Sequence, residues 1–180
     1  MKYKLVLWAV VWVLIIPDAY AQARRPSAPS RQHQTSVVLG ARRHSEHSIY
    51  DELPFTNRDM SYVLGWEVHD VAGFWQLGVN YTPDIGDATN GVRYAVSPFA
   101  NLLLKDRGWL AGVGVMSSYV AYEEEREWTS IYWQLMLGFS IPVSRFEVDV
   151  MVYYPFKRWN EIREFSTRDL EFGGLLRYHL

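Results

Sequence analysis

The 180-residue chain contains no cysteine. This excludes a disulfide scaffold, a thiolate metal site, a cysteine nucleophile and a lipid anchor attached through cysteine. The chain also lacks an excess of positive charge, since 18 Lys and Arg residues stand against 20 Asp and Glu residues and give a formal net charge of -2. Such a balance leaves no broad basic surface for a phosphate backbone, so we expect no nucleic-acid partner.

The only long apolar run lies at the N-terminus. Lys2 and Lys4 precede the apolar residues 5–16, and Pro17 then interrupts the segment. Residues 19–21 (Ala-Tyr-Ala) have alanine at the two positions where a signal peptidase requires small residues. The alternative is a retained membrane anchor, but a spanning helix needs about 20 apolar residues and the run is shorter. We predict a cleaved signal peptide over residues 1–21.

The next segment, residues 22–35, has the sequence QARRPSAPSRQHQT. It is rich in Pro, Ser and Arg and has no large apolar side chain that could offset the entropy of ordering it. We predict that it is a flexible leader, and that the folded domain comprises residues 36–180.

Within residues 36–180, apolar residues recur at every second position, which is the spacing of a β-strand with two different faces. The least regular of these segments runs from Trp109 to about Tyr122, because both of its faces are mixed. Eight such segments follow one another, at residues 36–42, 60–69, 75–81, 92–105, 109–122, 130–141, 146–154 and 170–180. The sequence therefore predicts an all-β domain of eight strands.

The connections alternate in length along the chain. Those at residues 69–73, 105–108 and 142–145 are tight turns, whereas those at residues 43–59, 82–90, 123–127 and 155–169 are long. Short turns at one end and long loops at the other are typical of outer-membrane barrels. In this layout, nearly the whole mature chain resembles the small eight-stranded outer-membrane β-barrel superfamily.

The resemblance implies an eight-stranded antiparallel up-and-down transmembrane β-barrel in the outer membrane of a Gram-negative-type bacterium. Residues 22–35 would then be a periplasmic leader. The implied partners are outer-membrane lipids, lipopolysaccharide and the outer-membrane assembly machinery, and no cofactor or metal is implied.

Alternation alone does not say which face meets lipid, so a secreted lipocalin-like barrel with an apolar cavity is the alternative. Two features favour lipid outside: aromatic residues lie on the apolar face near strand ends, and charges of both signs lie on the polar face. An eight-stranded barrel has an interior just wide enough to be filled by side chains. We therefore predict a packed interior polar network, closed to solutes, formed by Glu67, His69, Arg93, Glu147, Asp149, Glu171 and Arg177.

The first long loop has the residue types of a serine hydrolase or a His/Glu metal site, in His44, Ser45, Glu46 and Ser48. Some small outer-membrane barrels are lipid A deacylases or palmitoyltransferases with Ser and His near the outer rim. The His-x-Ser arrangement of the deacylases is missing from the seventh predicted strand, which reads FEVDVMVYY. We therefore favour a non-catalytic protein, with a lipid A-modifying hydrolase or acyltransferase as the alternative.

The last long loop interleaves aromatic and basic residues. Its candidates for contact with lipopolysaccharide are Lys157, Arg158, Trp159 and Arg163, since cationic side chains bind phosphates and Trp lies at membrane interfaces. The alternative is a hydrated loop with local charge pairs. The predicted function is envelope integrity or surface interaction through four extracellular loops.

Overall fold

The computed structural model describes residues 35–45, 55, 59–83, 85, 92–123 and 125–180, except for the side chains of residues 163 and 164. The predicted signal peptide and the leader up to residue 34 lie outside these residues. Thr35, the last residue of the predicted leader, is instead the first residue of β1 and pairs with Val68.

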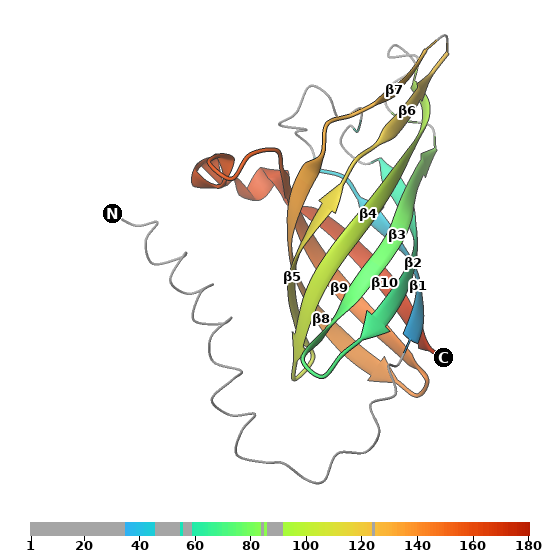
Figure 1. Ribbon diagram of the computed structural model, residues 1–180, viewed down its shortest axis with the longest axis vertical. Helices are drawn as coiled ribbons and strands as arrows, with labels where there is room; N and C mark the ends of the chain where they lie inside the picture. The colour runs from blue at the N-terminus through green and yellow to red at the C-terminus, as the bar shows by residue number, and fades with distance from the viewer. Residues whose placement is uncertain (1–34, 46–54, 56–58, 84, 86–91, 124) are drawn as a thin grey trace. The chain divides into compact units, whose positions relative to one another are not determined.

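The described residues form ten strand segments and two short 3-10 helices (Figure 1). The strands are β1 (Thr35–Arg43), β2 (Met60–His69), β3 (Gly73–Pro83), β4 (Val92–Asp106), β5 (Trp109–Met116), β6 (Tyr119–Tyr122), β7 (Arg126–Trp128), β8 (Tyr132–Val143), β9 (Phe146–Phe156) and β10 (Glu171–His179). The helices are η1 (Glu161–Glu164) and η2 (Thr167–Asp169). No helix in the described part of the chain has the length and apolar character needed to span a bilayer.

The strands close into a barrel, because β1 pairs with β10 on one side and β2 on the other, and β3 pairs with β4. All pairings in the described sheet are antiparallel. β5 and β6 pair with successive parts of β4 and together form one strand of the wall. β7 pairs with β6 and β8 pairs with β5, so β7 and β8 together form the next strand, and the ten segments make eight strands. The predicted eight-stranded up-and-down barrel is confirmed. Closure pairs the backbone groups of the wall, as lipid requires.

Tight turns connect the strands at one end of the barrel, which we call the turn end; the opposite end is the loop end. Asp106 pairs with Trp109 across two residues of positive φ, Arg107 at 49° and Gly108 at 90°. These are the dihedral signs of a type I′ turn, whose twist matches that of paired strands and in which Gly is favoured. The β4–β5 turn therefore follows from its sequence.

The outer surface of the wall is apolar. Large apolar side chains exposed on it include Leu39, Tyr62, Leu64, Trp66, Trp75, Leu77, Trp109, Leu137, Phe139, Val150, Phe172 and Leu176. Aromatic pairs lie towards both ends: Trp109 with Phe139 near the turn end, and Tyr81 with Tyr94 near the loop end. This is the apolar band with aromatic borders of an outer-membrane β-barrel, and it contradicts the lipocalin-like alternative.

The interior differs from the prediction in being only partly polar. Apolar side chains such as Phe74, Leu103, Leu110 and Met151 share it with buried charges and amides. The segment 109–122 looked mixed on both faces because its inward positions include Leu110 and Met116. Apolar groups inside the barrel fill the volume that the hydrogen-bonded polar groups leave.

Arg93 does not lie in the interior, so this part of the predicted network is wrong. The β4–β6 register shifts between Val92 and Tyr94. Val92 consequently packs against the core, whereas Arg93 is exposed. A bulge adds one residue to one strand and thereby reverses which side chains point inward.

Candidate functional site

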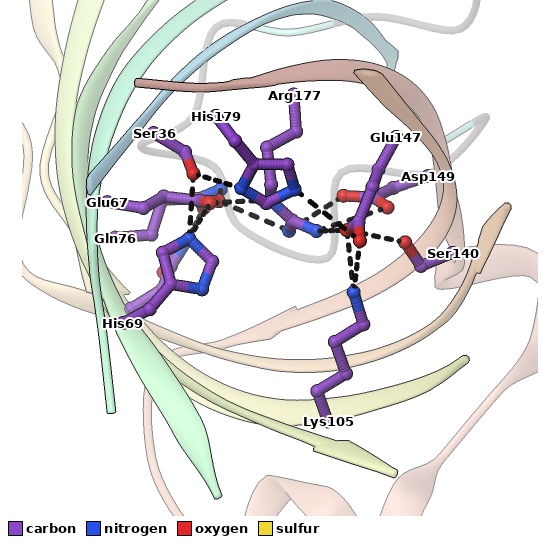
Figure 2. Close-up of polar contacts among 11 residues, drawn as sticks. Ser36, Glu67, His69, Gln76, Lys105, Ser140, Glu147, Asp149, Arg177 and His179 are labelled. Carbon is purple, nitrogen blue, oxygen red and sulfur yellow. Dashed lines mark hydrogen bonds and ion pairs between the residues drawn. The ribbon is translucent and has the colours of Figure 1, made fainter. Parts of the chain in front are cut away.

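The turn end of the interior is organised around Arg177 on β10, whose side chain is 1% exposed. Its Nε lies 2.5 Å from Glu67 Oε2, Nη1 lies 2.6 Å from Glu147 Oε2, and Nη2 lies 2.8 Å from Asp149 Oδ2 (Figure 2). The guanidinium also lies over the Phe74 ring, 4.5 Å from its centroid. One planar cation with five donors can bind carboxylates from β2 and β9 at once, which a lysine ammonium cannot do in the same plane.

A second cation completes this turn-end cluster. Lys105 Nζ on β4 lies 2.6 Å from both oxygens of Glu147, and the Ser140 hydroxyl donates to Glu147 Oε2 over 3.0 Å. Three carboxylates (Glu67, Glu147 and Asp149) therefore share two cations, with two histidines beside them (Figure 2). Each charge lies against a charge of opposite sign, which offsets part of the cost of removing it from water.

Two histidines flank Ser36 at the same end. His69 Nε2 lies 2.9 Å from Ser36 Oγ and 3.1 Å from Glu67 Oε2. A carboxylate only accepts, so His69 Nε2 carries a proton and donates to both oxygens. Ser36 then donates to His179 Nδ1, 2.9 Å away. Among the described residues, no group of three or more His, Asp or Glu side chains is arranged so that it could hold a metal ion.

A row of side-chain amides connects the two ends of the barrel. Gln76 donates to Glu67 over 2.8 Å, Asn101 to Gln76 over 2.8 Å, and Gln134 to Asn101 over 2.7 Å. Arg42 then donates from Nη1 to Gln134 over 2.8 Å. Neither an amide nor a guanidinium gives up a proton readily, so the row is suited to packing the interior rather than to conducting protons.

The loop end holds a second cluster, which we call the loop-end cluster: Arg42, His44, Ser61, Thr82 and Glu171. Arg42 Nε lies 2.5 Å from Glu171 Oε2, and His44 Nδ1 lies 3.1 Å from Glu171 Oε1. His44 Nε2 lies 2.6 Å from Ser61 Oγ, which is also 2.6 Å from Thr82 Oγ1. The five side chains come from the ends of β1, β2, β3 and β10, and all are buried.

Two aromatic rings confine this cluster. Phe55 stacks on the His44 imidazole, with ring centroids 3.9 Å apart and planes 4° from parallel. Tyr153 lies under the guanidinium of Arg42, whose Cζ is 4.2 Å from the ring centroid. These contacts pack one face of the His44 imidazole and of the Arg42 guanidinium against an aromatic ring.

The last long loop forms an element that we call the outer flap, residues 157–170. Tyr154 and Phe156 at the end of β9 point away from the interior, yet they are 4% and 0% exposed. The flap covers them: the ring centroids of Phe165 and Tyr154 are 5.0 Å apart, and those of Trp159 and Phe156 are also 5.0 Å apart. At this place the chain covers its own apolar wall near the loop end.

The structure separates the residues that the sequence grouped together. Glu67, His69, Glu147, Asp149 and Arg177 meet in the turn-end cluster. Glu171 lies apart from them, in the loop-end cluster, where its partner is Arg42 rather than Arg93 or Arg177.

The loop candidates are only partly within the described residues. His44 and Ser45 are buried, whereas Glu46 and Ser48 lie outside the described part of the chain. Lys157 is half-buried, Arg158 is exposed, and Trp159 is 55% exposed. Arg163 is on η1, and its side chain is not among those described.

Sequence reasoning missed several residues of the two clusters and of the amide row between them: Arg42, Ser61, Gln76, Thr82, Asn101, Lys105 and Gln134. All but Thr82 stand on the polar side of predicted strands, and that position is the signal that could have found them. Their partners could not be paired, because alternation assigns a face without assigning neighbours across the interior.

Two solved structures are similar to the chain in fold. Neisserial surface protein A is 12% identical, with a TM-score of 0.43, over 81% of this chain and 94% of its own. Ail, the attachment invasion locus protein of Yersinia pestis, solved in complex with the heparin analogue sucrose octasulfate, is 12% identical, with a TM-score of 0.38, over 83% of this chain and 100% of its own. No protein-family model matches the sequence, and no curated protein matches it significantly.

Proposed function

We propose that this outer-membrane barrel is a closed membrane anchor that supports envelope integrity or surface interaction through its loops, rather than a pore. The observation that carries the proposal is the row of hydrogen-bonded side chains that crosses the interior between the two clusters. Opening a solute path would break these bonds and leave buried amide groups without hydrogen-bond partners, which is costly.

The test is conductance. Purified protein inserted into planar bilayers is expected to give no stable channel steps, because the interior side chains of an eight-stranded wall leave no aqueous path. Long-lived open steps from the folded barrel, identified by its heat-modifiable gel mobility, would contradict the proposal.

We further propose that the outer flap contacts the phosphates of lipopolysaccharide through Lys157, Arg158 and Arg163, with Trp159 at the interface. Arg158 is exposed beside Trp159, whose ring also contacts Trp133 on the lipid-facing wall, with centroids 5.4 Å apart. An aromatic side chain next to a cation suits the boundary between acyl chains and phosphates.

A matched pair of variants tests this contact. Arg158→Gln is expected to weaken binding of the reconstituted barrel to lipopolysaccharide, and Arg126→Gln, which removes an exposed arginine from β7, is expected to leave it unchanged. Lipopolysaccharide without its phosphates is expected to bind both variants and the parent protein equally. Equal binding of all three proteins to the phosphorylated form would refute the proposed contact.

A further inference from the structure

The loop-end cluster contains a serine, a histidine and a carboxylate that are hydrogen-bonded in the order found in serine hydrolases. Ser61 Oγ lies 2.6 Å from His44 Nε2, and His44 Nδ1 lies 3.1 Å from Glu171 Oε1. We infer that Ser61, His44 and Glu171 are a nucleophile, general base and orienting acid that attack carboxylic esters. This activity goes beyond the proposed function. Its nucleophile, Ser61, is not one of the two serines that the sequence analysis considers, Ser45 and Ser48.

The donors and acceptors of the cluster agree with this assignment. The Glu171 carboxylate only accepts, so His44 Nδ1 carries a proton and donates to it. With a neutral imidazole, Nε2 is then an acceptor aimed at the Ser61 hydroxyl, which is the tautomer a general base needs. Thr82 completes the chain by donating to Ser61 Oγ, so every hydrogen bond has one donor and one acceptor.

The turn end provides an internal comparison. Ser36 also contacts imidazoles, but His69 uses one nitrogen, Nε2, for both Ser36 and Glu67. The Nε2 atom of the other imidazole, His179, lies 3.5 Å from Glu147 Oε1, a distance beyond the range of a good hydrogen bond. Among the described residues, His44 is the histidine that places a serine and a carboxylate at hydrogen-bond distance on opposite ring nitrogens.

Arg42 adds a second feature of a binding site. Its Nε and Nη1 are occupied by Glu171 and Gln134, while Nη2 is buried and has no hydrogen-bond partner among the described residues. A buried cationic donor without a partner is costly, and an oxyanion bound in the cluster would satisfy it. The same residue holds Glu171, so it acts on His44 as a positioning residue.

The proposed step is acyl transfer with water as the second reactant. Ser61 Oγ forms a bond to the ester carbonyl carbon while its proton passes to His44 Nε2. The bond from that carbon to the alkoxy oxygen breaks, and the leaving oxygen takes the proton from His44. Water then attacks the acyl-serine through the same base, and this releases the carboxylic acid and restores the Ser61 hydroxyl.

Access to Ser61 is set by its surroundings, because the side chain is fully buried and Phe55 covers the imidazole beside it. Removing the Phe55 ring is therefore expected to speed the reaction of Ser61 without altering the hydrogen bonds that activate it. A serine that was only a packing residue would gain exposure in the same variant but no reactivity, and this difference makes the inference testable.

The experiment is covalent labelling of the full-length, detergent-folded barrel with a fluorophosphonate, followed by peptide mass spectrometry. We expect one phosphonyl adduct on Ser61, formed at least tenfold faster in Phe55→Ala. In the Phe55→Ala background, His44→Gln is expected to slow labelling at least tenfold, and Ser61→Ala to abolish it. Ser97, which is equally buried but bonded to Ser118 and no histidine, should stay unlabelled in the same spectra.

Two results would overturn the inference. One is the absence of a Ser61 adduct in both the parent protein and Phe55→Ala, when both show the gel mobility of folded barrels. The other is labelling of Ser61 at equal rates with and without His44. Hydrolysis of p-nitrophenyl butyrate by Phe55→Ala, absent in the Phe55→Ala/Ser61→Ala double variant, is the expected catalytic counterpart. Channel conductance is measured separately, so failure of this inference is distinguishable from failure of the proposed function.

Discussion

Replacing Arg177 by Met tests whether the turn-end cluster is held together by one buried cation. The guanidinium is 1% exposed and lies between 2.5 and 2.8 Å from Glu67, Glu147 and Asp149. Glu67 and Asp149 have no exposed side-chain surface, so the variant leaves two carboxylates buried without their cation. Breaking a buried ion pair in this way costs about 3 to 5 kcal/mol.

The assay is reversible urea unfolding of the barrel in lipid vesicles, followed by the fluorescence of its tryptophans. Arg126→Met, on the exposed strand β7, is the matched control and is expected to change the unfolding free energy by no more than about 0.5 kcal/mol. Adding Glu67→Gln to Arg177→Met is expected to recover part of the loss, because it removes one of the unpaired charges. A loss below about 1 kcal/mol in Arg177→Met would refute the cluster as a coupled ionic unit.

Three further outcomes can be checked in the same unfolding assay. Val150→Arg, at an outward position that is 55% exposed, is expected to cost about 2 to 4 kcal/mol in a bilayer, whereas Val150→Leu should be tolerated. Glu171→Leu is expected to cost about 3 to 5 kcal/mol because it leaves Arg42 buried without a carboxylate, and unchanged stability would exclude that pair. Arg93→Ala is expected to be neutral within about 0.5 kcal/mol, and a larger loss would place Arg93 back in the interior.

The placement of the charged residues shows how well the alternation of polar and apolar residues predicts which side chains face the barrel interior. Glu67, Glu147 and Arg177 lie inside, as their positions on polar strand faces predict. Arg93 breaks the rule because a register shift at the start of β4 inverts the faces. Glu171 also faces the interior, but it pairs with Arg42 and not with another residue of the predicted network. Partners across the interior depend on strand tilt and stagger, which the alternation does not specify.

The outer flap is a similar case. Its aromatic and basic composition is evident from the sequence alone and is the basis of the predicted contact with lipopolysaccharide. That Tyr154 and Phe156 are covered by the flap instead of by lipid depends on where the loop returns to the wall, which no local pattern specifies.

The sequence by itself determined the number of strands, the alternation of long and short connections, and the division of each strand into an apolar and a polar face. These features are local, because a strand repeats every two residues and a turn has a short signature. Only the tertiary structure decided which polar side chains meet. His44 directly follows β1, Ser61 is on β2 and Glu171 is on β10, and barrel closure brings them together, since β1 pairs with both β2 and β10. Hydrogen bonds between such distant residues depend on register and shear, which are properties of the whole closed sheet.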